Sequence, residues 1–139
     1  MNYFIFQAVD KTYPRFLEDL RPTHTVRWMA TRYRTRMTIG DLVYLWRGGD
    51  AAIRGIYGWG RIVGPPAEDA PAGEFRVPVT YERRLSQHVS VSDIKSDYRL
   101  IRMQILNLPV GTNFQISLNE AQAIASHIND ADRPALGVR

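Results

Sequence analysis

Apolar and polar positions along the chain follow patterns that predict several short strands. Residues 3–8 (Y-F-I-F-Q-A) are aromatic and β-branched, as in a first strand, and residues 25–29 form a second extended piece. Residues 42–46 are apolar at almost every position, which predicts a strand covered on both faces. From residue 75 to 81 apolar and polar side chains alternate, as in a half-buried strand, and Pro78 within it predicts an edge position.

A hairpin is predicted in the middle of the chain. Gly48-Gly49-Asp50 is a turn sequence that leads back into a strand from Ile53 to Val63. One face of the returning strand carries Ile53, Tyr57, Trp59 and Arg61, and the other carries Ile56, Gly58, Gly60 and Ile62. Only one of these faces can meet a ligand. Glycines at alternate positions leave a face open, so that another group can approach the backbone closely.

Helices are predicted on either side of these strands. Pro14 suits the first turn of a helix that begins near Lys11 and runs to Leu20. Ser117 and Glu120 form a capping box, and Ala121, Ile124, Ala125 and Ile128 give the apolar stripe of the helix behind it. Residues 64–74 read as a loop, and the chain from Asp130 onward as loosely held. We therefore predict an α+β fold, a small mixed-sheet β-barrel of about five or six strands with flanking helices. Its single domain spans residues 1–130, followed by a C-terminal tail at 131–139.

Composition narrows the functional classes. A chain of 139 residues with 45% hydrophobic content is long enough for one core and argues against disorder. Cysteine is absent, which excludes disulfides and thiolate sites. The N-terminus lacks a signal-peptide pattern, and no apolar run approaches the roughly 20 residues of a membrane span. We expect a cytoplasmic protein with no membrane contact.

Positive charge and tryptophan are concentrated in one stretch. All three tryptophans lie between Trp28 and Trp59. Residues 27–61 hold seven arginines against Asp41 and Asp50, a net charge of +5, whereas the whole chain carries +4, so the remainder sums to −1. Aromatic surface beside a positive patch is the usual footprint of nucleic-acid binding. A core role for the tryptophans and a solvated face of arginines is the alternative interpretation.

Patterns typical of catalysis are absent from the sequence. His24, His88 and His127 are isolated, without the spacing of a metal site. Gly58-Trp59-Gly60 begins like a dinucleotide-binding loop, but Pro65 and Pro66 exclude the helix that such a loop requires. We therefore expect no cofactor, no metal and no enzymatic activity.

An ordered series of motifs resembles the EVE domain, a member of the PUA-like superfamily that also includes YTH and SRA-type readers. The series is Trp28, Tyr33, Ile39-Gly40-Asp41, Tyr44-Leu45-Trp46-Arg47-Gly48-Gly49 and Gly55-Ile56-Tyr57-Gly58-Trp59-Gly60. Residues 3–8 and 109–114 resemble the two ends of the family, so the likeness covers about residues 3–128. The N-terminus is more similar to the restriction-associated variety, found beside nucleases and McrB-type motors encoded separately.

The resemblance implies a non-catalytic module that binds nucleic acid and stacks a flipped modified base, such as 5-methylcytosine in DNA, between aromatic side chains. Trp28 would stack on the base. The implied base-binding pocket is Trp28, Tyr33, Trp46, Arg47, Gly48, Gly49, Tyr57, Trp59, Asn113 and Phe114. The implied phosphate-binding residues are Arg27, Arg32, Arg34 and Arg36. Trp46 fits a core position equally well, and Asn113 fits a role in holding its own loop's backbone equally well.

Estimated binding energies agree with a protein that recognises a modified base. Stacking a base on an aromatic ring contributes roughly 1–3 kcal/mol, which offsets the cost of flipping the base. Discrimination of a methyl group is limited to tens of fold. Alternatives are a reader of modified RNA, a binder or enzyme that takes a free nucleobase or nucleoside in the same pocket, and a purely structural interaction module. Steep salt dependence would separate a nucleic-acid reader from a free-base binder.

Overall fold

The computed structural model describes residues 1–69 and 73–136. Within them, seven strands form one mixed sheet in the order β2-β6-β4-β3-β1-β7, and β5 pairs with β6. Only the β1–β3 pair is parallel in this described sheet. The strands are β1 (Tyr3–Ala8), β2 (Thr25–Met29), β3 (Leu42–Arg47), β4 (Gly55–Ile62), β5 (Ala67–Asp69), β6 (Glu74–Ser90) and β7 (Asn113–Ile116).

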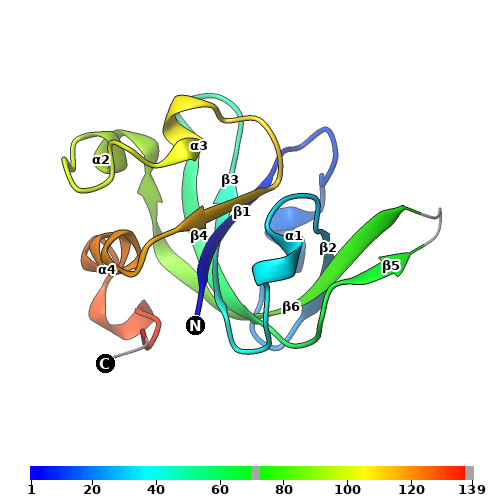
Figure 1. The fold of residues 1–139 in the computed structure, drawn as a ribbon. Helices are drawn as coiled ribbons and strands as arrows, with labels where there is room; N and C mark the ends of the chain where they lie inside the picture. The colour runs from blue at the N-terminus through cyan, green and yellow to red at the C-terminus, as the bar shows by residue number, and fades with distance from the viewer. Residues whose placement is uncertain (70–72, 137–139) are drawn as a thin grey trace.

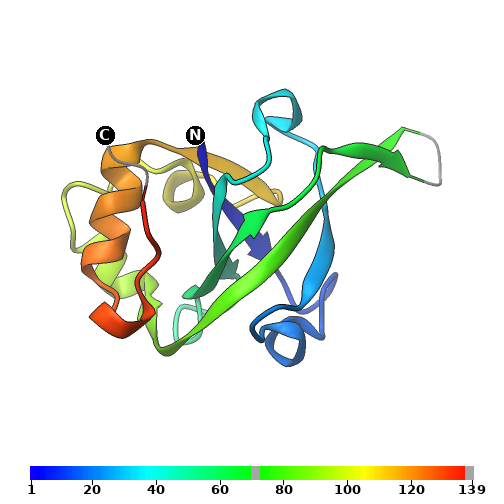
Figure 2. The ribbon, with the colours of Figure 1, turned by 90° about the horizontal axis from the view of Figure 1, so that it is seen from below.

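Short helices lie mainly on one side of the sheet. They are α1 (Phe16–Asp19), α2 (Val91–Lys95), α3 (Gln104–Asn107) and α4 (Leu118–Ser126), with 3-10 turns η1 (Arg34–Arg36) and η2 (Asp130–Asp132). In both views α2 and α4 gather on one side of the molecule, whereas the β5–β6 hairpin projects on the opposite side (Figures 1 and 2). The predicted capping box of α4 is confirmed, because Ser117 and Glu120 each accept a hydrogen bond from the other's backbone N–H. None of the helices in the described residues is long and apolar enough to cross a membrane.

The sheet curls until its two end strands meet. The rings of Phe6 on β1 and Trp28 on β2 lie 5.7 Å apart although these strands do not pair. The Asn113 side chain on β7 donates to the Met29 carbonyl on β2 over 2.9 Å. This contact closes a seam between β2 and β7. The predicted fold class, an α+β mixed sheet curled into a barrel, is confirmed. Its strands number seven in the described residues, because β5 lies in the stretch predicted as a loop.

Two apolar clusters cover the two faces of the sheet. The helix-side cluster packs α2, α3 and α4 against one face and contains Tyr44, Trp46 and Trp59. The barrel cluster lies within the curl and contains Phe6, Trp28 and, on β6, Tyr81. Residues 42–46 are buried throughout, as predicted for a strand covered on both faces.

Three predictions about single segments are wrong. The helix expected from Lys11 to Leu20 shortens to the single turn of α1. Pro78 lies in an interior strand between β2 and the end of β4. Its carbonyl points away from β2 and accepts from Val63 N at 3.1 Å. The N and O of a strand residue point to the same side, so its pairing with Arg27 on β2 loses no hydrogen bond through the missing N–H. The chain from Asp130 was predicted to be loosely held, but its described part is anchored at Asp132, whose buried carboxylate accepts from Ser86 N at 3.0 Å and Ser86 Oγ at 2.8 Å. Residues 137–139 of the predicted tail lie outside the described residues.

Irregular pairing of β4 with β6 places Tyr57 and Trp59 on opposite faces of the sheet. The register shifts between Ile56 and Gly58 and again between Trp59 and Gly60. Tyr57 therefore packs against the barrel cluster and Trp59 enters the helix-side cluster, although regular alternation placed them on one face. A Cβ at Gly58 would stand 2.6 Å from the Arg83 carbonyl and 2.9 Å from Leu20 Cδ1. The open face predicted from the glycines is filled by β6 and by Leu20, the residue that follows α1.

Candidate nucleic-acid interface around Trp28

Trp28 sits in a cage of aromatic rings inside the barrel. Tyr13 meets it at 5.4 Å and 73°, Phe16 at 6.2 Å and 81°, and Phe6 at 5.7 Å and 51°. Only 4% of its surface is exposed. Edge-on contacts of this kind hold the indole firmly, since aromatic pairs favour tilted geometry.

A chain of hydrogen bonds fixes the polar edge of Trp28. Its indole N–H donates to the Tyr81 hydroxyl at 3.0 Å, and that hydroxyl lies 3.1 Å from the Tyr13 hydroxyl. Tyr13 in turn donates to the Asp19 carboxylate at 2.9 Å, so Tyr81 is the donor toward Tyr13. Burial raises the pKa of Tyr81 to about 12, and burial also raises the pKa of Tyr13 far above its ordinary range. Both hydroxyls therefore stay protonated at neutral pH.

A cavity of about 490 Å³ opens beside this cage along the edge of β2. Its volume falls within the roughly 300–1,000 Å³ of small-molecule sites. Its lining combines apolar surface, hydroxyls and two arginines: Gln7, Thr12, Tyr13, Val26, Arg27, Trp28, Met29, Arg76 and Thr112. None of the described residues that line it carries a carboxylate or an imidazole. Among the residues that the structure describes, no group of three or more His, Cys, Asp or Glu side chains is placed to hold a metal ion.

The two arginines that line the cavity and the other predicted phosphate-binding arginines differ in how their charge is compensated. Arg27 lies 3.1 Å and Arg76 3.8 Å from the Asp69 carboxylate, so their charges are partly compensated. The other three predicted phosphate-binding residues contact uncharged groups. Arg32 donates to the Val110 carbonyl at 3.0 Å, Arg34 lies 4.0 Å from the Phe75 ring centroid, and Arg36 donates to Gln115 at 3.1 Å. These contacts orient the guanidinium groups and leave their charge available for an anion.

Two of the predicted pocket tryptophans lie elsewhere. Trp46 is fully buried in the helix-side cluster because β3 is covered on both faces. Trp59 is 7% exposed in the same cluster, and its indole N–H donates to the Asp132 carbonyl at 2.7 Å. Neither lines the cavity at Trp28. The sequence interpretation that grouped three tryptophans around one ligand therefore differs from the structure, in which the sheet separates Trp28 from the other two.

The predicted closing residues also serve the fold. Asn113 is fully buried, and its side chain makes four hydrogen bonds across the seam. Its amide nitrogen donates to Met29 O, and its amide oxygen accepts from Thr31 N, Thr31 Oγ1 and Arg32 N. Phe114 is buried in the helix-side cluster, and the Arg32 guanidinium lies 5.1 Å from the centroid of its ring. The structure thus gives Asn113 the backbone-holding role, and Phe114 does not face the cavity.

The remaining predicted pocket residues form a separate group around the β3–β4 turn. Tyr57 stacks on His88 at 4.5 Å and 8°, and the Arg47 guanidinium lies 5.7 Å from the Tyr57 ring centroid. Gly48 packs against Gln7, and Gly49 has a φ of +117° that favours glycine in the turn. Tyr33 belongs to neither group, because its hydroxyl donates to Gln104 at 3.1 Å. Of the fourteen predicted site residues, the cavity lining includes Arg27 and Trp28.

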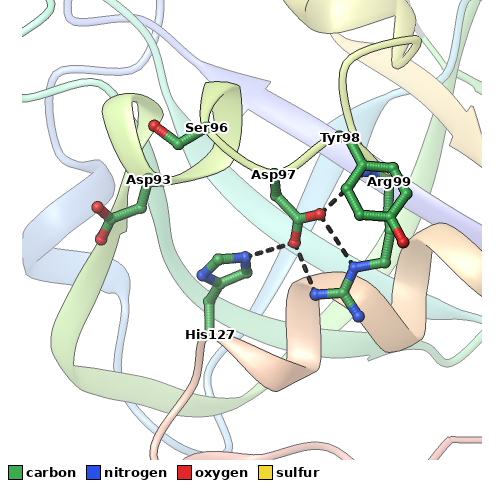
Figure 3. Close-up of a pocket in the computed structure, with 6 residues that line it drawn as sticks. All are labelled: Asp93, Ser96, Asp97, Tyr98, Arg99 and His127. Carbon is green, nitrogen blue, oxygen red and sulfur yellow. Dashed lines mark hydrogen bonds and ion pairs between the residues drawn. The ribbon is translucent and has the colours of Figure 1, made fainter.

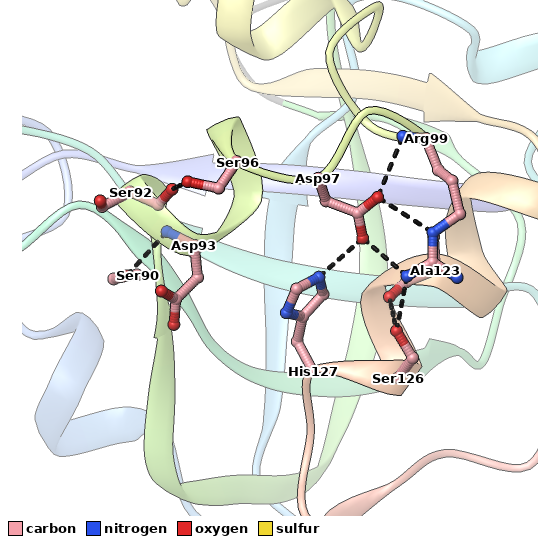
Figure 4. A network of polar contacts seen from close by, with 9 residues as sticks. All are labelled: Ser90, Ser92, Asp93, Ser96, Asp97, Arg99, Ala123, Ser126 and His127. Atoms are coloured by element: carbon pink, nitrogen blue, oxygen red, sulfur yellow. Dashed lines mark hydrogen bonds and ion pairs between the residues drawn. The ribbon is translucent and has the colours of Figure 1, made fainter.

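A second cavity of about 490 Å³ lies beyond α2, between Asp93, Ser96, Asp97, Tyr98, Arg99 and His127 (Figure 3). Asp97 lies between Arg99 and His127, and its carboxylate accepts from Arg99 Nε at 2.9 Å and stands 2.8 Å from His127 Nε2. Hydrogen bonds from Arg99 and His127 hold the pKa of Asp97 well below its ordinary value. Arg99 also donates to Ser126 on α4 (Figure 4). Asp97 is thus paired within this group of side chains, and the contacts with Ser126 and His127 hold the loop after α2 against the end of α4. His127, which looked isolated in the sequence, has this carboxylate as its partner.

Tyr13 and Arg76 are cavity residues that the sequence interpretation missed. Arg76 is a polar position of the alternating strand at 75–81, so its surface exposure was predictable, but its neighbour Arg27 comes from a distant segment. Tyr13 lies in a stretch predicted as a helix entry. Its contact with Trp28 joins segments that sequence periodicity does not relate.

Known structures share this fold. The human THYN1 protein, solved in complex with 5-methylcytosine containing DNA, superposes with a TM-score of 0.75 at 14% identity, covering 94% of this chain and 99% of that one. The protein Rpa0253 from Rhodopseudomonas palustris gives a TM-score of 0.74 at 14% identity over 91% and 92% of the two chains. A mutant of the ASCH protein from Zymomonas mobilis gives 0.57 at 6% identity over 93% and 100%. At such identities the likeness establishes the fold.

Sequence comparison identifies the family. No curated protein matches the chain. A family model, that of the EVE domain, matches residues 2–127. The match includes β1 through α4 and thus all the strands that the structure describes. The resemblance predicted from the motif series is confirmed, and the chain belongs to the EVE domain family.

Proposed function

We propose that this protein is a non-catalytic module that binds nucleic acid and holds one modified base, with 5-methylcytosine in DNA favoured, in the cavity beside Trp28. The observation that carries the proposal is the meeting of an aromatic cage with a cavity of base-binding dimensions and arginines at its rim. Membership of the EVE family supports it. So does the same fold in human THYN1, whose structure contains 5-methylcytosine DNA.

The lining chemistry favours binding over catalysis. General acid–base catalysis needs a group that titrates near neutral pH and reaches the substrate. The cavity offers hydroxyls, an amide and guanidinium groups, and its tyrosine keeps its proton because burial raises the pKa of Tyr13. Hydroxyls and an amide suit recognition of a polar base edge by hydrogen bonds.

Binding energy would come from stacking and from phosphate contacts. A base on an aromatic ring contributes roughly 1–3 kcal/mol. A buried methyl group adds about 0.8 kcal/mol, which is about a fourfold preference for the methylated base. Arg32, Arg34 and Arg36, whose charges are not compensated by their contacts, supply the electrostatic part, and each phosphate contact steepens the salt dependence.

Fluorescence anisotropy tests the proposal. Short single- and double-stranded DNA probes and an RNA probe carry one central cytosine, plain or 5-methylated, and are titrated at two salt concentrations. Trp28→Ala removes the stacking ring. Tyr98→Ala is the matched control, because this exposed aromatic lies at the second cavity.

The proposal predicts tighter binding of the methylated DNA probe, lost in Trp28→Ala, retained in Tyr98→Ala and weakened by salt. Preference for the RNA probe would move the ligand to modified RNA. Salt-independent binding of a free nucleoside alone would contradict the nucleic-acid proposal. A separately encoded nuclease or motor partner and a cytoplasmic location stay predictions of the family resemblance.

A further inference from the structure

The stacking surface of Trp28 is covered in the free protein. The ring is 4% exposed, yet a stacked base needs an open aromatic face. A neighbouring ring must therefore leave before a base can stack. The three rings in contact with Trp28 are Phe6 on β1, Phe16 on α1 and Tyr13 in the connection between them.

Tyr13 is the ring that can move. Phe6 is fully buried and Phe16 is 3% exposed, whereas Tyr13 is half-buried and lines the cavity. Its backbone lies outside any helix or strand and is held by a turn in which Tyr13 N donates to Val9 O at 2.8 Å. Loop residues of this kind open at lower free energy than strand residues.

The hydroxyl of Tyr13 holds the ring in place. It donates to Asp19 and accepts from Tyr81, and both partners keep another contact if the ring departs. Tyr81 still accepts from Trp28 at 3.0 Å, and Asp19 still lies 3.8 Å from His24. Displacement of Tyr13 therefore costs two hydrogen bonds. The buried Tyr81 hydroxyl still accepts from Trp28, but its proton loses its acceptor.

We infer that Tyr13 occupies, in the free protein, the place on Trp28 that the flipped base takes in the complex, so that the base enters by displacing this ring. The inference rests on the proposed function and makes Tyr13 a positioning residue that sets the threshold for base entry. A base that stacks poorly does not compensate for the loss of the two hydrogen bonds. Because only a fraction of the free protein is open, the apparent affinity for every base is the intrinsic affinity multiplied by that fraction.

Tyr13→Phe tests the inference, because it keeps the ring and removes both hydrogen bonds. Each ordinary hydrogen bond shifts an equilibrium by a factor of roughly 2 to 10, so affinity for the 5-methylcytosine DNA probe should rise about fivefold or more. Tyr33→Phe is the matched control, since it removes one hydrogen bond from a half-buried tyrosine that contacts Gln104 instead. Its affinity should equal that of the wild type.

A second measurement needs no nucleic acid. In protein labelled with 5-fluorotryptophan, the ¹⁹F signal of Trp28, assigned by its loss in Trp28→Phe, should show exchange with a minor open state. That state should grow in Tyr13→Phe and stay unchanged in Tyr33→Phe. No exchange in either variant, or an affinity that Tyr13→Phe leaves unchanged or lowers, overturns the inference while Trp28-dependent binding still supports the proposed function. Exchange as expected without binding of any probe supports the movement of Tyr13 and contradicts the proposed function.

Discussion

Replacement of Asn113 by alanine should destabilise the whole barrel through one side chain. The amide is fully buried and joins β7 to the end of β2 through four hydrogen bonds, at 2.9, 2.9, 3.3 and 3.4 Å. Alanine leaves the Met29 carbonyl and the Thr31 N–H without their partner. A buried group left unsatisfied costs about 1–3 kcal/mol. Since these two backbone groups are only part-buried, we expect a loss of about 2–4 kcal/mol of unfolding free energy.

Urea unfolding followed by tryptophan fluorescence measures this loss, and amide hydrogen exchange locates it. The Thr31 amide should lose protection in Asn113→Ala, whereas amides of the β3–β4 pair should change only with global stability. Gln115→Ala is the control, because it removes a single bond to Arg36 on the exposed side of the same strand. A change below about 0.5 kcal/mol, with Thr31 protection intact, would refute the assignment of Asn113 to the seam.

Three further predictions concern the opposite side of the molecule. Contacts with Arg99 and His127 lower the pKa of Asp97 from its ordinary value of 3.8. The ionised carboxylate therefore stabilises the fold fully at a pH above 3.8, and this stabilisation is lost as the pH falls through the lowered pKa. Asp97→Asn should therefore lower the melting temperature at pH 7 and flatten its decline in acid, as thermal unfolding across pH 2–7 would show. Ser117→Ala should cost about 1 kcal/mol by removing the α4 cap, measured by urea unfolding. Trp46→Phe should leave probe affinity in the anisotropy titration unchanged, because Trp46 lies across the sheet from the cavity.

Local patterns along the chain predicted the elements well. The aromatic run at 3–8, the extended piece at 25–29 and the capping box at Ser117 all appear with their predicted bounds. Each depends on side-chain alternation or on hydrogen bonds between residues three apart. Those features are set by nearby residues, so the sequence contains the information needed to predict them.

Contacts between segments that are distant in the sequence were harder to predict. Bulges in β4 separate Tyr57 from Trp59, and no periodicity signals them. Trp28 was predicted to stack on a base, but its burial beneath Tyr13 depends on how the chain before α1 folds back. The Asp97–His127 contact spans 30 residues and gives a partner to a histidine that looks isolated in the sequence. Clustering along the chain therefore did not predict which tryptophans lie together, because Trp46 and Trp59 share the helix-side cluster and Trp28 lies in the barrel cluster.

The three tryptophans allow a direct test of whether a modified base stacks on Trp28. Their indole N–H groups lie in different surroundings: Trp28 donates to Tyr81, Trp59 donates to the Asp132 carbonyl, and Trp46 Nε1 has no partner in the described residues. Each therefore gives its own signal in a ¹H–¹⁵N spectrum. We would titrate labelled protein with a DNA probe carrying one 5-methylcytosine. If a base stacks on Trp28, the Trp28 indole signal should shift strongly, and those of Trp46 and Trp59 should stay nearly unmoved. A shift confined to Trp46 or Trp59, or binding that leaves Trp28 unmoved, would contradict this stacking.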